Sequence, residues 1–133
     1  MTKETFDDLH RLIKRGDLIA VRHVLGEGLS PNFENKFGWT MLMLAASEGN
    51  TAIGELLISS GADTNRATNT GQTALSLAIL GGHIGFLKML LTHGAHPNTI
   101  GAVEKWLPAF RLKTSTEQAI FEEIRRYRDR NSS

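Results

Sequence analysis

The stretch that decides the fold is Gly38-Trp39-Thr40-Met41-Leu42-Met43-Leu44-Ala45-Ala46-Ser47-Glu48-Gly49-Asn50. Thr40 precedes an apolar run, so its side-chain oxygen can accept a hydrogen bond from a free amide in the first turn of a helix. Gly49 follows the run, where a helix end favours a left-handed residue. A second helix is expected from about Thr51 to Ser59, ended by Gly61. The stretch therefore predicts two short helices joined by a tight corner.

Residues with special conformational roles recur along the chain at a spacing of 33. The sets that follow this spacing are Gly16, Gly49 and Gly82; Gly28, Gly61 and Gly94; Asn32, Asn65 and Asn98; Leu9, Leu42 and Leu75; Gly38 and Gly71; and Thr40 and Thr73. A fixed period of this length is typical of repeat proteins, in which each unit buries its apolar faces against its neighbours. The helix pair is therefore expected to be one unit of a stack.

The aligned positions resemble the ankyrin-repeat family, whose pattern is Gly-x-Thr-Pro-Leu-His-x-Ala-Ala, then Gly-His, Leu-Leu and Gly-Ala-x-x-Asn. The matching segments are Gly38 to Ala46, Gly71 to Ala78, Gly82-His83, Leu90-Leu91, Gly61 to Asn65 and Gly94 to Asn98. The resemblance implies an all-α ankyrin-repeat α-solenoid, in which stacked helix-turn-helix pairs are joined by β-hairpin-like loops and flanked by N- and C-terminal capping helices. Met41 and Ala74 replace the family's proline and Met43 and Ser76 its histidine, so these copies are expected to lose turn stiffness and a polar tie.

One domain is expected over residues 1–133, because a chain of 133 residues with 41% hydrophobic residues suits a single domain. Its predicted parts are an N-terminal capping repeat at about 5–37, repeats at 38–70 and 71–103, and a degenerate repeat with a C-terminal capping helix at 104–133. Gly54 and Gly85 lie inside the expected second helices, where glycine costs about 1 kcal/mol relative to alanine. Gly54→Ala is therefore predicted to raise the melting temperature.

Charge and composition narrow the classes of function. The 15 Lys and Arg residues and 14 Asp and Glu residues give a net charge of +1, which supplies no overall field to attract nucleic acid or an anionic membrane. The absence of cysteine excludes a disulfide framework and thiolate metal sites. No signal peptide or membrane span is visible at the start of the chain. We expect a monomer in the cytoplasm or nucleus, without a membrane partner.

The residues that could carry chemistry favour structural roles. His83, His93 and His96 suggest a metal site, but the family resemblance gives His83 an ordinary place in the Gly-His corner and His93 one at the variable position before the glycine. Because cysteine and a convergent carboxylate are also missing from the pattern, no metal and no cofactor are expected. The serines lack a histidine and an acid held beside them, which argues against an enzyme. The arginines in 125–130 could bind phosphate, but the acidic residues among them favour a solvated capping helix over a nucleic-acid site.

In the ankyrin family, the hairpin tips and the first-helix face form the concave recognition surface. The positions that match it here are predicted to bind a partner: Lys36, Phe37, Trp39, Met43, Ser47, Glu48, Asn69, Thr70, Gln72, Ser76, Leu80, Val103, Lys105 and Trp106. Phe33, Phe37 and Trp39 are the strongest candidate anchors, because desolvated aromatic residues dominate interface energies. The alternative is that Phe37 and Trp39 pack on the adjacent repeat.

The predicted function is therefore non-enzymatic protein-protein interaction through the hairpin tips and the concave inner-helix face. The alternative from another class is a regulatory or inhibitory subunit that masks an enzyme active site or a DNA-binding surface. The first hypothesis predicts a preformed surface that needs little rearrangement on binding.

Overall fold

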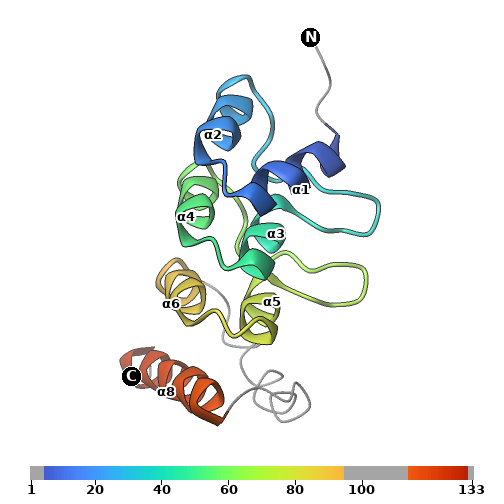
Figure 1. Ribbon diagram of the computed structural model, residues 1–133. Helices are drawn as coiled ribbons and strands as arrows, with labels where there is room; N and C mark the ends of the chain where they lie inside the picture. Colours follow the sequence, from blue (N-terminus) through green and yellow to red (C-terminus); the bar gives the residue numbers. More distant parts are fainter. Residues whose placement is uncertain (1–4, 95–113, 132–133) are drawn as a thin grey trace.

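The computed structural model describes residues 5–94 and 114–131, and these residues form seven helices, six of them in two layers (Figure 1). The inner layer consists of α1 (Phe6–Arg15), α3 (Met41–Glu48) and α5 (Ala74–Leu80), and the outer layer of α2 (Leu18–Gly26), α4 (Thr51–Ser59) and α6 (Ile84–Thr92). The last helix, α8 (Thr114–Asn131), packs beside α6. The predicted all-α solenoid is confirmed.

Helices of the same layer stack on one another from repeat to repeat. α3 lies between α1 and α5, and α4 lies between α2 and α6. Hairpin-like loops connect successive helix pairs and project to one side of the stack (Figure 1). Isolated antiparallel bridges join Glu34 to Thr40 in the first loop and Ala67 to Thr73 in the second. The two bridges are equivalent, and each closes a hairpin loop directly before an inner helix begins.

The inner helices begin at the expected caps. Thr40 Oγ1 accepts from the Met43 amide at 3.3 Å, and Thr73 Oγ1 accepts from the Ser76 amide at 3.1 Å. The expected loss of a polar tie is wrong for Ser76, because its hydroxyl oxygen lies 2.8 Å from the Thr73 amide and closes a full capping box. In the other copy the Met43 sulfur takes this place at 3.4 Å from the Thr40 amide.

An acidic capping box begins α1. Thr5 and Asp8 exchange hydrogen bonds, with the Asp8 amide 3.2 Å from Thr5 Oγ1 and the Thr5 amide 3.1 Å from the Asp8 carboxylate. The bond from the Thr5 amide, then the bond from the Thr5 hydroxyl, and more weakly the charge of Arg11 hold the pKa of Asp8 below its ordinary value of 3.8. The helix therefore starts two residues earlier, relative to the period, than α3 and α5 do.

The recurring asparagines tie each repeat to the next. Asn32 Nδ2 donates to the carbonyl of Gly61 at 3.2 Å, and Asn32 Oδ1 accepts from the amide of Asp63 at 2.7 Å. Asn65 repeats the first of these bonds with the carbonyl of Gly94 at 3.2 Å. The spacing of 33 between these asparagines thus has a structural explanation. In both cases, the asparagine side chain bonds the loop after one outer helix to the equivalent loop of the next repeat.

The core runs through the two layers and is made of aliphatic side chains, methionines and one phenylalanine. Six consecutive residues of α3, Met41 to Ala46, are buried, as are Ala74 to Ile79 of α5. In α8, Ile120 and Ile124 are fully buried, while Arg125, Arg126 and Arg130 are exposed. The inner helices α3 and α5 are therefore enclosed along most of their length, whereas α1 buries only Leu9 and Ile13, and α8 has an apolar side and a charged side.

The structure argues against the prediction that Gly54→Ala raises the melting temperature. A Cβ atom at this position would lie 2.6 Å from Cε2 of Phe86 and 2.7 Å from the terminal methyl of Met89. Gly54 is buried where α4 and α6 touch, so its missing side chain lets the two outer helices approach closely. Gly85 differs, because a Cβ there would meet only Thr51 Oγ1, at 3.8 Å.

Candidate protein-binding surface

Side chains at the base of each hairpin tip fix the shape of the tip. Asn35 Oδ1 accepts from the amides of Phe37 at 2.9 Å and Trp39 at 3.0 Å. Thr68 Oγ1 accepts from the amides of Thr70 at 3.3 Å and Gln72 at 3.1 Å. Sequence reasoning missed both anchoring residues, although their spacing of 33 was a usable signal.

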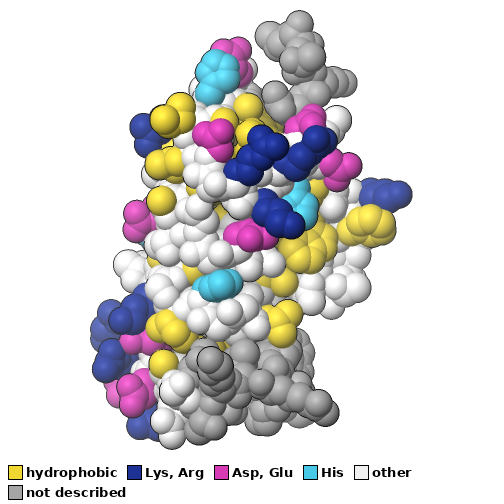
Figure 2. Space-filling view, in the orientation of Figure 1, with side chains coloured by type: hydrophobic (Ala, Val, Ile, Leu, Met, Phe, Trp, Pro, Cys, Tyr) yellow, Lys and Arg dark blue, Asp and Glu magenta, His cyan; other side chains and the backbone are white. Residues whose placement is uncertain are grey.

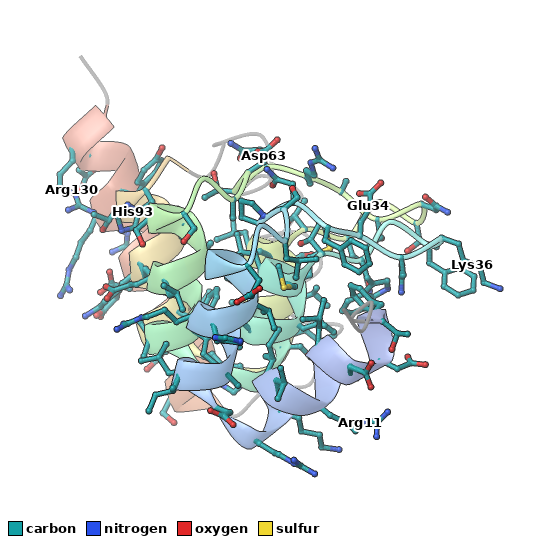
Figure 3. The ribbon with its side chains drawn as sticks, turned by 90° about the horizontal axis from the view of Figure 1, so that it is seen from above. Arg11, Glu34, Lys36, Asp63, His93 and Arg130 are labelled. Atoms are coloured by element: carbon teal, nitrogen blue, oxygen red, sulfur yellow. The ribbon has the colours of Figure 1, made fainter. Side chains whose placement is uncertain are left out.

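The two hairpins are also bonded to each other. Asn69 donates its backbone amide to the Phe37 carbonyl at 3.0 Å and its side-chain amide to the Lys36 carbonyl at 3.2 Å. Glu34 lies closer to the stack than Lys36 (Figure 3), and Arg66 Nη1 lies 3.2 Å from the Glu34 carboxylate. The tips therefore form one surface, and a ligand meets a fixed arrangement of groups.

Phe37 is the most exposed aromatic side chain among the described residues. It is 56% exposed, and Lys36 Nζ lies 5.2 Å from the centre of its ring. Figure 2 shows a hydrophobic side chain next to a Lys or Arg at the edge where the hairpins project. Trp39 is partly buried against the core, and Phe33 packs on Phe6 with ring centres 6.2 Å apart. Of the three candidate anchors, only Phe37 stands clear of the stack.

Two predicted contact residues need correction. Met43 is only 1% exposed because it lies in an inner helix between two others, and Ser76 is 6% exposed because its hydroxyl is used to cap α5. Neither side chain is available to a partner in this structure. The pattern placed both on the first-helix face, but residues 41–46 of α3 and 74–79 of α5 are buried, so only the C-terminal ends of these helices are exposed.

The remaining predicted residues divide by position. Ser47, Glu48 and Leu80 are exposed at the C-terminal ends of α3 and α5. Val103, Lys105 and Trp106 lie outside the described residues. We define the tip surface as the exposed and partly exposed residues of the two hairpins: Lys36, Phe37, Trp39, Asn69, Thr70 and Gln72. It presents one aromatic ring, one ammonium group and several neutral polar groups.

His83 has a structural role between two repeats. His83 Nε2 lies 3.1 Å from the carbonyl oxygen of Ser47, so the ring joins the corner of one repeat to the preceding inner helix. Its ring packs against Gly49, whose φ of +73° and lack of Cβ leave room for it. Among residues 5–94 and 114–131, no three His, Asp or Glu side chains are grouped as a metal site would require.

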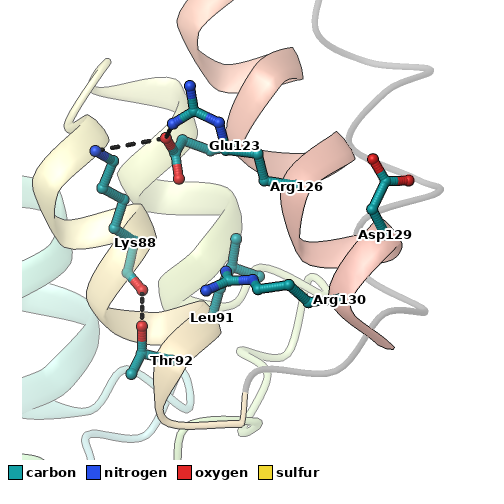
Figure 4. Close-up of a pocket in the computed structure, with 7 residues that line it drawn as sticks. All are labelled: Lys88, Leu91, Thr92, Glu123, Arg126, Asp129 and Arg130. Atoms are coloured by element: carbon teal, nitrogen blue, oxygen red, sulfur yellow. Dashed lines mark hydrogen bonds and ion pairs between the residues drawn. The ribbon is translucent and has the colours of Figure 1, made fainter. Parts of the chain in front are cut away.

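Apart from the tip surface, a groove lies between α6 and α8 (Figure 4). Glu123 is buried there, with its carboxylate 2.9 Å from Arg126 and 3.4 Å from Lys88. Leu91, Thr92 and Arg130 line the same groove. Because Lys88 of α6 and Arg126 of α8 both contact the Glu123 carboxylate, these ion pairs help to hold the last helix on the stack.

These features define a helical repeat protein with a preformed, projecting surface. The profile described as "Ankyrin repeats (3 copies)" matches residues 9–100, and the chain belongs to the ankyrin-repeat family. Ankyrin repeats are generally protein-protein interaction modules and typically carry no catalytic activity.

Similar proteins come from several kinds of animals. The chain is 35% identical over 113 residues, 81% of its length, to the ankyrin repeat and KH domain-containing protein mask-1 of Caenorhabditis elegans. It is 33% identical over 86 residues, 65% of its length, to the inactive serine/threonine-protein kinase TEX14 of Bos taurus. A third relative is the 2-5A-dependent ribonuclease of Mus musculus, 35% identical over 71 residues, 53% of this chain.

The matched region is a small part of each of these relatives. It makes up 4% of mask-1, 6% of TEX14 and 10% of the ribonuclease. The chain therefore corresponds to a small segment of each relative. Within the described residues, no helix combines the length and the apolar character needed to cross a membrane.

Proposed function

We propose that this chain is a non-enzymatic interaction module that binds a partner protein through the tip surface. The observation that carries the proposal is the exposure of Phe37 on a tip whose backbone is already fixed by Asn35 and Asn69. A rigid aromatic side chain loses little conformational freedom on binding, and burying it supplies much of the energy of a typical interface. Ser47, Glu48 and Leu80 extend the surface toward the inner helices.

The chemistry of the tip surface supports selective binding. Lys36 adds a positive charge beside the aromatic ring, and Asn69, Thr70 and Gln72 supply hydrogen-bonding groups without charge. A partner that fits would bring an apolar side chain and a carboxylate near each other. The module would act without a cofactor, in the cytoplasm or the nucleus.

The proposal is tested by affinity capture from a native lysate with two matched variants, Phe37→Ser and Ile19→Ser. Both residues are large, apolar and exposed, but Ile19 lies on outer helix α2, away from the hairpins. Phe37→Ser is expected to weaken capture of a specific partner on the order of 10-fold or more, as loss of an interface anchor does. Ile19→Ser is expected to retain that partner.

Equal melting temperatures of the two variants would show that the loss comes from the surface. Capture that is unchanged by Phe37→Ser, or that falls equally in both variants, would contradict binding through the tip surface.

A further inference from the structure

The outer helices carry an exposed aliphatic side chain that the tip surface does not explain. Ile19, in the first turn of α2, is 82% exposed. Its equivalents at the spacing of 33 are Ala52 on α4 and Gly85 on α6, and both are exposed. We call Ile19, Ala52 and Gly85 the outer row. Along this row the side chain changes from large in Ile19 to small in Ala52, and Gly85 has none.

Charged residues of both signs lie beside the outer row. Arg22 and Glu55 each follow a member of that row by three positions, so they lie on the same face of their helices. Both are exposed, and in the part of the chain that the structure describes neither forms an ion pair. Figure 2 shows hydrophobic side chains interspersed with charged ones along the edge formed by α2 and α4.

A shallow groove separates these two outer helices. Leu18 and Arg22 line it from α2, and Ala52, Glu55 and Leu56 from α4. Ala52 is one of the small residues that line this groove, and Ile19, next to Leu18 on α2, projects into solvent. The face thus carries a projecting side chain, a hollow, a positive group and a negative group.

We propose that the outer face of α2 and α4 binds a second copy of this chain. α2 and α4 are equivalent helices that lie side by side (Figure 1). A twofold axis parallel to them and midway between them places α2 of one copy against α4 of the other, in both directions. Ile19 then enters the hollow beside Ala52 of the second copy, and Arg22 faces Glu55 of the second copy.

Self-complementarity favours this occupant over an unrelated protein. The twofold rotation brings Ile19 of each copy to Ala52 of the other. It also brings Arg22 of each copy to Glu55 of the other, so each contact is made twice. A net charge of +1 opposes the meeting of two copies very little. The tips project from a different side of the stack, so both copies keep the tip surface free (Figure 1). The proposed dimer differs from the monomer expected from the sequence, and it does not depend on the proposed function.

Sedimentation equilibrium of the purified full chain tests this inference. Between about 1 µM and 1 mM, the range of weak protein interfaces, the average mass is expected to rise from that of one chain toward that of two. Ile19→Glu, which puts a charge in the hollow, is expected to keep the mass of one chain throughout. Phe37→Ser serves as the control and is expected to dimerise as the wild type does.

Charge reversal tests the pairing itself. Arg22→Glu or Glu55→Arg alone is expected to weaken dimerisation on the order of 10-fold, because like charges then face each other. An equimolar mixture of these two variants is expected to form mixed dimers, since opposite charges face each other at both contacts in that pair. A wild-type mass that stays at one chain, a dimer that persists in Ile19→Glu, or a mixture that associates no better than either variant alone would overturn the inference.

Discussion

Gly54 shows how one residue sets the distance between two elements. Its position against Phe86 and Met89 leaves no room for a methyl group. Gly54→Ala is therefore expected to lower the stability by about 1 to 3 kcal/mol, the usual cost of overpacking a core, despite the gain in helix propensity. Urea unfolding followed by circular dichroism measures the change as a lower midpoint with an unchanged slope.

Gly85→Ala is the matched control for this prediction. Gly85 is exposed in the first turn of α6 and has space for a methyl group, so the substitution is expected to add about 0.4 to 1 kcal/mol by restricting the unfolded chain. If both variants shifted the midpoint upward, helix propensity would outweigh the contact with Phe86, and the close approach of α4 and α6 would not be what requires glycine.

Helix caps could be predicted from the sequence, whereas buried contacts between helices could not. The period of 33 correctly identified Thr40 and Thr73 as caps, because a cap depends on neighbours three positions away. It could not identify the burial of Met43 or the contact of Gly54 with Phe86. Both depend on how closely a neighbouring helix approaches, and that distance is set by all the side chains between the helices.

At the scale of elements, α8 is held by charge as well as by apolar contact. Glu123→Gln keeps the shape of the side chain but removes its charge from between Lys88 and Arg126. Because both cations are more than half exposed, the expected loss is only about 1 kcal/mol. It should appear as an approximately 5-fold faster hydrogen exchange of the α8 amides, with the exchange of α3 unchanged.

Glu122→Gln provides the comparison for Glu123→Gln, because it makes the same chemical change one position away on the exposed side of α8. It is expected to leave the exchange of α8 as in the wild type. Equal acceleration in both variants would mean that the net charge of the helix, and not the contact with Lys88, governs how α8 is held.

The sequence predicted the positions of the helices better than it predicted the tip surface and the contacts between the hairpins. Caps, glycine corners and apolar spacing located α3, α4, α5 and α6 closely, because each signal is local. The tip surface was located by family resemblance, and its exposed aromatic residue, Phe37, was among three candidates. The bond between Asn69 and the Phe37 carbonyl joins segments 32 positions apart, and no local pattern reports it.

At the scale of the whole stack, the described repeats are arranged in one dimension, and this arrangement determines where their stability lies. The helix pair α3–α4 has a neighbouring repeat on both sides, whereas the pair α1–α2 has one on a single side within the described residues. In a stack of this kind each unit contributes its own stability and that of its interfaces, and a unit with two neighbours opens only when the others open too. The central repeat should therefore report the global stability of the protein.

Native-state hydrogen exchange of two cavity variants tests this view of the stack. Leu57→Ala, in the core of the central repeat, is expected to cost about 2 to 5 kcal/mol and to accelerate the slowest amides of α3, α4, α5 and α6 by the same factor. Val21→Ala, in the end repeat, is expected to accelerate the amides of α1 and α2 more than those of α5 and α6. If Val21→Ala instead accelerated all helices equally, the repeats would open as one cooperative unit, and the position of a residue along the stack would not matter.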